Sequence, residues 1–545
     1  MINNSRSIAR NRRTVVIALG LALLTAPAAA AADTGAPPAP TVAPAPATAP
    51  APAPASAAEH RVSAFLDSIR DRPQDLAAFF RQLPKGGDLH SHLAGAVSTE
   101  LLMDLAVMDG LCIENGTQRA LAPPCPANSR PAADLRTDAE FRQQVLRAWS
   151  MQDFTPGEES GHDHFFATFG KFGEASWRHP GKLMAEVANT VARQNQFYQE
   201  LMITPNSPGA NPLADRVGYD ANLPRMRQKL LADGAMDQVV RQARTDADQG
   251  LAEFRATAHC DSAQPDPGCA VPFRFISQVS RNSAPERVFT QMVVAMELAE
   301  RDPRFVAVNL VQPEDGAVSL RDYSLHMRML GHLHRVYPRA HITLHAGELA
   351  PGLVKPEDLR FHIAEAVNVA HAERIGHGVD IRHEDGADGL LRSMAERRVA
   401  VEVPLSSNDQ ILGVSGPEHP FPLYRQRGVP VVLATDDAGV SRITISDEYR
   451  RAATTYDLSY RELKDLARAS LEYAFLPGRS LWRTPDGYRP VLECLAERPG
   501  KREPGRLCAA FLAANEKAAV EWRQEAAFTA FEQRVLASPR SQARS

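Results

Sequence analysis

The stretch HITLHAGELAPGLVKPEDLRFHIAEAVNVAHAERIGHG, which runs from His341 to Gly378, carries the pattern that decides the fold. Its first part, HITLHAGE, is an apolar run with a polar end and predicts a strand. PEDLRFHIAEAVNV predicts a helix, and ERIGHG predicts a second short strand. A strand, a helix and a strand in this order are typical of a parallel βαβ unit.

The same alternation continues on both sides of this unit. RFVAVNLV precedes it as a predicted strand, followed by the predicted helix LRDYSLHMRMLGHLHRVYP. After it come a predicted helix, strand, helix and strand, namely ADGLLRSMAERR, VAVEVPLSSN, PFPLYRQRG and VPVVLATDDAG. Polar residues gather where the strands end, which is the edge at which a (β/α)8 barrel builds its active site. We therefore expect an α/β fold, a (β/α)8 TIM barrel with an insertion after strand 1 and extra terminal helices.

The stretch GGDLHSHLAG, from Gly86 to Gly95, predicts the first barrel strand and places His90 and His92 one residue apart. Successive side chains of a strand point to opposite faces, so these two imidazoles face the same side, toward the barrel axis. Two histidines that converge there suit a divalent metal ion, zinc by default. Taken alone, an H-x-H pair is more often a core or surface feature than a ligand pair.

Three later strand ends carry groups that would complete such a site. TLHAGE supplies His345 and Glu348, RIGHG supplies His377, and LATDDAG supplies Asp436 and Asp437. Single members have structural explanations, since Asp437 could cap a helix and His377 could be a satisfied core histidine. As a set, three histidines and one carboxylate can hold one zinc ion per chain with room for a water, whose pKa zinc lowers to about 7.

The first residues predict export. Residues 1–32 hold four arginines before an apolar run from Val15 to about Ala26, and small residues follow that run. This order is typical of a signal peptide, and the run is too short to span ~30 Å of hydrocarbon comfortably. The Ala/Pro-rich segment 33–58 predicts a disordered linker, which leaves 59–545 as the folded barrel domain with its insertion at about 109–170. We therefore expect a periplasmic or secreted protein.

The six cysteines fit an oxidising compartment. They fall in three pairs that are close in sequence, and the simplest pairing is Cys112–Cys125, Cys260–Cys269 and Cys494–Cys508. Fifteen pairings are open in principle, and free buried thiols are the alternative. The net charge of −4 is small and no block of like charge occurs, so we expect no nucleic acid and no membrane as a partner of the mature form.

The motifs PKGGDLHSHLAG, HAGE, RIGHG, VPLSSN and TDD, in this order, resemble those of the metal-dependent adenosine/AMP deaminase family of the amidohydrolase superfamily. The resemblance spans about Leu83 to Leu476. The leader, the insertion and the Pro-Lys-Gly lead-in look closest to the secreted growth-factor-like adenosine deaminase branch. The resemblance implies zinc-dependent hydrolytic deamination of adenosine, or of a related 6-aminopurine nucleoside, to inosine and ammonia.

The resemblance also implies roles for individual residues. Glu348 matches the proton donor to purine N1, and His377 matches the histidine that activates the water at the metal. Asp437 matches the carboxylate that holds purine N7. The metal ligands implied by position are His90, His92, His345 and Asp436.

Two positions depart from the family pattern and concern nucleoside recognition. The family usually reads H-x-H-L-D-G, with the aspartate near the ribose 5′-hydroxyl, whereas this chain has Ala94 there. The family also has a glycine whose backbone meets the purine edge, and in VNLVQPED the aligned residue is Gln312. Ala94 cannot hydrogen-bond a sugar hydroxyl, so a modified adenosine or another 6-aminopurine nucleoside stays open as the substrate.

Two other functions remain open at this point. One is an amidohydrolase that acts on a different amine or amide. A two-metal version would usually need a lysine at the end of a middle strand, and neither ELMITPN nor VAVNLVQPED offers one, which favours one metal. The other is a catalytically inactive protein that keeps the deaminase barrel for binding. The oligomeric state is also open, with a homodimer among the options.

Overall fold

The computed structural model of the chain describes residues 56–205, 207–485 and 487–537. The predicted signal peptide and residues 33–55 of the predicted linker lie outside the described residues. The described part begins with a helix, α1 (Ala57–Ile69), whose first turn is closed by a capping box between Ser56 and Glu59. Helix α2 (Pro73–Gln82) follows, with Pro73 as its first residue.

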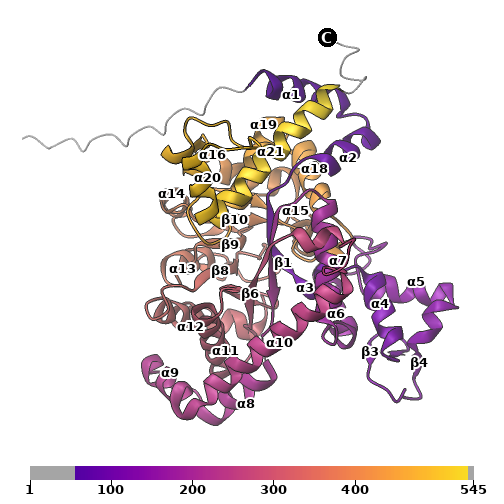
Figure 1. Cartoon of the computed structure of the whole chain (residues 1–545). Coiled ribbons are helices and arrows are strands. Elements are labelled where there is room, and N and C mark those ends of the chain that lie inside the picture. The colour runs from indigo at the N-terminus through magenta and orange to yellow at the C-terminus, as the bar shows by residue number, and fades with distance from the viewer. Residues whose placement is uncertain (1–55, 206, 486, 538–545) are drawn as a thin grey trace, which may run out of the picture. The chain divides into compact units, whose positions relative to one another are not determined.

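Eight parallel strands form the barrel, and each pairs with the next along the chain (Figure 1). The pairing order follows the sequence because each strand is connected to its neighbour by a helical crossover. The predicted (β/α)8 barrel is therefore confirmed. Its strands are β1 (Gly87–His92), β5 (Tyr198–Ile203), β6 (Phe273–Ser280), β7 (Phe305–Val311), β8 (His341–Ala346), β9 (Arg374–His377), β10 (Ala400–Val403) and β11 (Val431–Leu433).

The barrel closes between its first and last strands through backbone just beyond β11. The backbone N–H of Asp436 donates to the carbonyl of His90 at 2.9 Å, and the N–H of His92 donates to the carbonyl of Asp436 at 3.1 Å. Ser91 and Asp436 form the corresponding parallel bridge. Three predicted metal ligands, His90, His92 and Asp436, thus lie where the first and last strands of the barrel meet.

Helices cover the outside of the barrel and carry most of its apolar contacts (Figure 1). The segment between β5 and β6 also holds α8 (Ser207–Val217) and α9 (Leu223–Leu231). The crossover helices are α7 (Pro180–Arg193), α10 (Ala235–Thr257), α11 (Pro285–Arg301), α12 (Ala317–His334), α13 (His362–Asn368), α14 (Ala387–Arg397) and α16 (Phe421–Gln426). After β11 come α17 (Ala438–Ser441), α18 (Ile445–Thr455), α19 (Tyr460–Glu472), the short hairpin β12 (Trp482–Thr484) and β13 (Arg489–Pro490), α20 (Arg506–Ala514) and α21 (Glu516–Ala537).

The long connection between β1 and α7 lies beside the carboxyl end of the barrel. After the short α3 (Leu93–Ala96) it holds two helices, a three-stranded sheet, and a further helix over the barrel mouth. The disulfide Cys112–Cys125 ties the first strand of this sheet to the loop between its other two strands, and the other two disulfides, Cys260–Cys269 and Cys494–Cys508, also match the predicted pairing. The elements are α4 (Thr99–Met108), β2 (Cys112–Glu114), β3 (Ala120–Leu121), β4 (Ser129–Pro131), α5 (Ala139–Ala148) and α6 (Gly161–Ser176).

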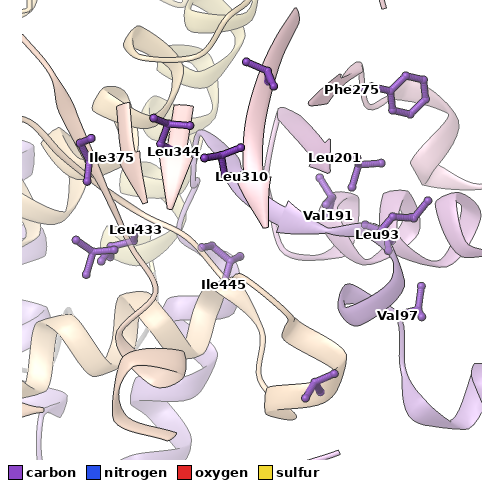
Figure 2. Close-up of a cluster of buried hydrophobic side chains, with 14 of the residues drawn as sticks. Leu93, Val97, Val191, Leu201, Phe275, Leu310, Leu344, Ile375, Leu433 and Ile445 are labelled. Atoms are coloured by element: carbon purple, nitrogen blue, oxygen red, sulfur yellow. The ribbon is translucent and has the colours of Figure 1, made fainter. Parts of the chain in front are cut away.

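Alternation along the strands separates the core from the site. On β8, Ile342 and Leu344 lie in the main hydrophobic core, while Thr343 and His345 point to the inside of the barrel. Figure 2 shows apolar side chains from successive strands and from the neighbouring helices, including Leu344, in this buried cluster. None of the described helices is long and apolar enough to cross a bilayer.

Two sequence-based expectations for these elements were wrong in extent. The helix expected over PEDLRFHIAEAVNV is only α13, because Pro356 to Phe361 forms turns that lead out of the barrel mouth. The strand expected over VAVEVPLSSN ends at Val403, and the helix α15 (Leu405–Leu412) begins after Pro404. Proline at the start of a helix removes no helical hydrogen bond, which explains why the chain changes structure there.

Candidate metal centre and active site

Three imidazoles and one carboxylate converge at the carboxyl end of the barrel. The Nε2 atom of His345 lies 3.1 Å from Nε2 of His90 and 3.2 Å from Nε2 of His92. The Oδ1 atom of Asp436 lies 3.4 Å from Nε2 of His90 and 3.2 Å from Nε2 of His92. All four side chains are buried, so residues that are up to 346 positions apart meet at one point.

This donor set fits a small divalent cation. Zinc–nitrogen bonds of about 2.0–2.1 Å in a tetrahedral site would separate two ligand nitrogens by roughly 3.3–3.4 Å. The observed separations of 3.1 and 3.2 Å between nitrogens are close to that value. Three histidine nitrogens and a carboxylate oxygen are typical zinc ligands. Among the described residues, His377 and Asp437 also come within reach of this group.

The imidazole ring of each predicted ligand histidine is oriented by a second polar group, which contacts its Nδ1 atom. Nδ1 of His345 lies 2.9 Å from Oδ1 of Asn309, and Nδ1 of His90 lies 2.7 Å from Oε2 of Glu402. The carboxamide of Gln278 lies 2.5 Å from Nδ1 of His92. Such partners fix the ring orientation and leave Nε2 facing the centre. These orienting residues were not identified from the sequence.

Glu402 belongs to a buried charge network inside the barrel. Its Oε1 accepts hydrogen bonds from Arg374 at 2.5 Å and from Thr343 at 2.9 Å, and Arg374 also pairs with Glu200. Burial alone would raise the pKa of Glu402, but Arg374 and His90 lower it to about 2. Glu402 therefore stays anionic behind His90. The sequence did hold a signal for this network, because Glu402 lies inside the apolar run VAVEV. An unpaired charge there would be costly, so a buried partner could have been expected.

Glu348 follows the ligand His345 after a turn at Gly347. Gly347 has a φ of 75°, and Glu348 enters the cavity beside His377, with Oε1 3.7 Å from Nε2 of that ring. Burial, with the negative charges of Asp436 and Glu314, raises the pKa of Glu348 well above its ordinary range. The carboxyl group is thus placed and tuned to hold a proton.

His377 stands across the centre from Glu348. Its Nδ1 lies 2.8 Å from Oδ1 of Asn408, so Nε2 is left on the side of Glu348 and Asp436 and has no hydrogen-bond partner among the described residues. That Nε2 atom lies 4.0 Å from Oδ2 of Asp436. The preceding residue is Gly376, where a Cβ would come within 2.6 Å of the His90 ring. The absence of a side chain at Gly376 therefore leaves room for the ring of His90, a predicted metal ligand.

The two aspartates after β11 have different environments. Asp436 has a φ of 59° and accepts a hydrogen bond from Ser407 at 2.6 Å, which holds its carboxylate on the histidines. Asp437 points into the cavity, and its Oδ1 has no hydrogen-bond partner among the described residues. Burial and the charge of Asp436 raise the pKa of Asp437 well above its ordinary range. Asp437 begins α17 but makes no side-chain cap, so the capping alternative is not what the structure shows.

A cavity of about 1280 Å³ opens onto this cluster. His92, His345, Glu348, Asp436 and Asp437 line its inner end. Residues of β6, of the loops after β5 and β7, and of α3, α6, α7 and α10 also line it, among them the charged Asp246 and Glu253 of α10. Five of the predicted site residues therefore border one concave space, of the kind that binds a small molecule.

Both positions that depart from the family pattern lie on this cavity. Ala94 follows the ligand strand in α3 and presents only a methyl group. Gln312 has a φ of 79°, a backbone conformation that favours glycine, and its Oε1 accepts the backbone N–H of Asn282 at 3.0 Å. The side chain of Gln312 is thus held by the neighbouring loop at the border of the cavity.

Glu314 supports the turn that carries Glu348. Its two carboxylate oxygens accept the backbone N–H groups of Gly347 at 3.1 Å and Glu348 at 2.9 Å, and His362 contacts the same carboxylate at 2.6 Å. In Glu314→Gln, an NH₂ group would face a donor, and the turn would shift. Because a displacement of about 1 Å can cost roughly 100-fold in rate, we expect kcat to fall about 10–100-fold with bound metal retained.

Steady-state kinetics and metal analysis would check this expectation. The matched control is Glu357→Gln, an exposed glutamate in the loop that follows β8. Unchanged kcat in Glu314→Gln with the purified folded protein would show that Glu314 does not position Glu348.

Helix α6 is attached to the barrel mouth by an ion pair. Nε2 of His162 lies 3.0 Å from Asp315, on the loop after β7, and Nδ1 lies 2.9 Å from Asp163, while the ring also packs on Phe166. The hydrogen bond to Asp315, opposed by burial, raises the pKa of His162 to about 9. A raised pKa means that the stabilisation is complete below the unfolded value of about 6.5 and is lost as the pH rises through 9.

We therefore expect His162→Gln to lower the melting temperature by about 1–3 °C at pH 6 and by much less at pH 10. Thermal unfolding of both proteins across this pH range would test the pair, with His60→Gln at an exposed position as the control. A difference that does not depend on pH would contradict a protonated His162.

The fold and this cluster define a class of protein, a parallel (β/α)8 barrel with a His/Asp metal-binding centre at the carboxyl ends of its strands. A sequence model of the adenosine deaminase family matches residues 178–482. The chain belongs to the adenosine deaminase family.

Known proteins resemble this chain over different lengths. An adenosine deaminase of Shewanella woodyi is 35% identical over 135 residues, which are 25% of this chain and 38% of that protein. The chain thus spans under half the length of that relative. An aminodeoxyfutalosine deaminase of Streptomyces coelicolor is 27% identical over 413 residues, or 75% of this chain and 85% of that protein.

Two solved structures are similar at lower identity. An N6-methyl-AMP deaminase from Arabidopsis thaliana is 21% identical with a TM-score of 0.48, over 73% of this chain and 94% of that one. A zinc-bound amidohydrolase from a Burkholderia species is 18% identical with a TM-score of 0.43, over 78% of this chain and 91% of that one.

Proposed function

We propose that this protein is a zinc-dependent hydrolase that removes the 6-amino group of adenosine or a related 6-aminopurine nucleoside. The products are the 6-oxopurine, inosine in the case of adenosine, and ammonia. The observation that carries the proposal is the convergence of three Nε2 atoms and the Asp436 carboxylate at the inner end of a cavity that Glu348 and Asp437 also line, with His377 next to Glu348. Membership of the adenosine deaminase family supports the reaction class.

His90, His92, His345 and Asp436 would hold the ion. A zinc ion bound there would lower the pKa of a water molecule to about 7 and so supply a nucleophile at neutral pH. The remaining steps fall to side chains around this cluster.

Three residues divide the handling of protons and substrate. Nε2 of His377 accepts a proton from the attacking water, whose oxygen adds to C6. The carboxyl group of Glu348 gives a proton to ring nitrogen N1, and the carboxyl group of Asp437 donates to N7, which is an acceptor. The proton held by His377 then passes to the amino group, the hydroxyl group at C6 returns a proton to the Glu348 carboxylate, the C6–N bond breaks, and ammonia leaves.

Removal of the metal tests this proposal. We expect a chelator to abolish the loss of ultraviolet absorbance that accompanies adenosine deamination, because the nucleophile needs the ion. About one equivalent of zinc should restore the rate. Magnesium should not restore it, since a site with three histidines prefers a softer ion. Full activity in metal-free protein, or no absorbance change with any 6-aminopurine nucleoside despite bound zinc, would contradict the proposal.

We place this reaction outside the cytoplasm. Three disulfides in the described residues and the leader pattern of residues 1–32 support export. Fractionation of cells that produce the full chain, with the mature N-terminus read by mass spectrometry, tests this placement. An intact leader on cytoplasmic protein would contradict it.

A further inference from the structure

Three leucines project from the segment 479–515, which follows the barrel and holds β12, β13 and α20. We call this segment the C-terminal lobe. Leu492, Leu495 and Leu507 are 72%, 57% and 75% exposed, and they are the exposed leucines of the described residues. Single exposed leucines are ordinary, but three in one small lobe mark an interaction surface. We call these three side chains the leucine patch.

A turn and a disulfide bring the members of the leucine patch together. Leu492 and Leu495 lie three residues apart around a 3₁₀ turn, in which such residues share a face. Leu495 directly follows Cys494, and Leu507 directly precedes Cys508. These two cysteines are bonded, with their Cα atoms 4.7 Å apart. The two segments that carry the leucines are therefore held side by side.

The lobe has an interior of its own, to which the leucine patch does not contribute. Trp482, Val491, Phe511 and Trp522 pack in a small core with the disulfide. The indole N–H of Trp522 donates to the carbonyl of Lys501 at 3.0 Å. The large aromatic side chains thus point inward while the leucines point outward. The lobe is already packed without them, so the leucine patch is free to contact something else.

Basic side chains accompany the leucine patch. Residues 479–508 hold seven arginines and lysines against four aspartates and glutamates, a net charge of +3, whereas the whole chain carries −4. Two of the basic side chains have a partner, since Arg479 pairs with Glu493 and Lys501 with Glu497. Five exposed arginines have no ion pair among the described residues, and we call them the unpaired arginines: Arg483, Arg489, Arg498, Arg502 and Arg506.

The lobe meets the barrel at the end opposite the metal cluster. Glu516, at the start of α21, pairs at 2.6 Å with Arg274, which lies near the amino end of β6. None of the described residues after Asp437 lines the cavity at the carboxyl end. A partner that covers the leucine patch would therefore leave the mouth of the barrel open.

We propose that the leucine patch and the unpaired arginines form a docking surface for a membrane that carries anionic lipids. In such contacts, apolar side chains enter the boundary between headgroups and acyl chains, while guanidinium groups stay beside the phosphates. The proposal does not depend on the deaminase function. It departs from the expectation, based on the charge of the whole chain, that a membrane is not a partner.

The composition of this surface favours lipid over a protein partner. Contacts that dominate binding between proteins are enriched in tryptophan and tyrosine, and leucine is under-represented there. In this lobe, Trp482, Tyr488 and Trp522 pack in or against the core. A second copy of the chain in a symmetric dimer would bring the unpaired arginines against themselves, and like charges repel.

Sedimentation with lipid vesicles tests the proposal. We expect the full chain to bind vesicles of phosphatidylcholine with about a third phosphatidylglycerol at least about tenfold more tightly than vesicles of phosphatidylcholine alone. High salt should remove most of this difference. Equal binding to both vesicles, or no binding to either, would overturn the proposal. Residues 1–32 also hold arginines and an apolar run, so the decisive comparison is between variants of the same full chain.

The first variant removes apolar contact. Leu495→Ser combined with Leu507→Ser should weaken binding to the anionic vesicles about tenfold or more, because both side chains lose their place in the acyl boundary. Met108→Ser, at an exposed position outside the lobe, is the matched control and should change binding less than about twofold. Wild-type binding by the folded leucine variant would overturn the proposal, since the surface would then attract anions without entering a membrane.

The second variant removes charge. Arg502→Gln combined with Arg506→Gln should weaken binding about tenfold or more, since each basic group near an anionic surface is worth roughly a factor of five. Arg328→Gln combined with Arg392→Gln removes the same charge from exposed helix positions outside the lobe and should change binding much less. Equal losses in the two pairs would show that only the overall charge matters, which would contradict a docking surface on the lobe.

A fluorescence measurement reports insertion at the leucine patch itself. In Leu507→Trp, brominated phosphatidylcholine in the anionic vesicles should quench the added emission, because the indole would lie in the acyl boundary. Trp482 and Trp522 are buried in the lobe, so the wild-type protein gives the background. Vesicle-bound Leu507→Trp without added quenching would contradict the proposal. So would a dimer in sedimentation velocity that the leucine variant abolishes, because the patch would then join two copies of the chain.

Discussion

Replacing Glu348 by glutamine is expected to lower kcat by about 10²–10⁴-fold while KM and bound zinc stay near their wild-type values. An amide has nearly the same shape as the carboxyl group but cannot give a proton to N1. The backbone N–H of residue 348 would still donate to Glu314, as it does now at 2.9 Å, so the turn would keep its position. The loss should therefore fall on the chemical step.

The experiment needs three readouts on the same protein. Initial rates at saturating substrate give kcat, elemental analysis gives the zinc content, and circular dichroism reports the fold. Glu357→Gln serves as the control because it removes an exposed carboxylate from the same loop. A variant with bound zinc and more than about a tenth of the wild-type kcat would exclude Glu348 as the proton donor.

Replacing His345 by alanine is expected to reduce the zinc content from about one ion to less than roughly a tenth, and to lower activity by at least about 10³-fold. His345 is the ligand whose Nε2 lies within 3.2 Å of both other histidine nitrogens, so its removal opens the centre of the donor set. Asn309 would also lose one of the two partners of its carboxamide oxygen, while the backbone N–H of residue 345 would still donate to it.

The control for this variant lies on the same strand. His341 begins β8 at the opposite end of the barrel, where it pairs with Glu373. His341→Ala should keep the metal and most of the activity, even if it lowers the melting temperature. Retention of stoichiometric zinc in His345→Ala would show that the ion is held elsewhere and would remove the basis of the proposed function.

The part of this structure that follows local patterns could be predicted from the sequence. The βαβ alternation from His341 to Gly378 predicts parallel strands, and β8 and β9 begin at or near the expected residues. Polar residues at strand ends predict a shared site, because all parallel strands end at the same edge. The pairing of neighbouring cysteines was also correct, since each pair closes a short loop.

The part that depends on packing across the barrel could not be predicted. Glu402, Asn309 and Gln278 act on histidines that are more than thirty residues away in the chain, and their partners are set by barrel register. The change from strand to helix after Val403 could not be predicted from the local sequence either, because PLSSN has no helical periodicity of its own. The support of Glu348 by Glu314 appears only when β7 and β8 lie side by side.

The backbone of Asp436 joins the two ends of the barrel, and its side chain faces the histidines of β1. Closure of the barrel and formation of the predicted metal site therefore depend on the same residue. A fragment limited to residues 178–482, the span recognised by the family model, would lack both β1 histidines and the strand that Asp436 must meet. We therefore expect activity only when all eight strands are present, and removal of the N-terminal part through β1 should abolish it.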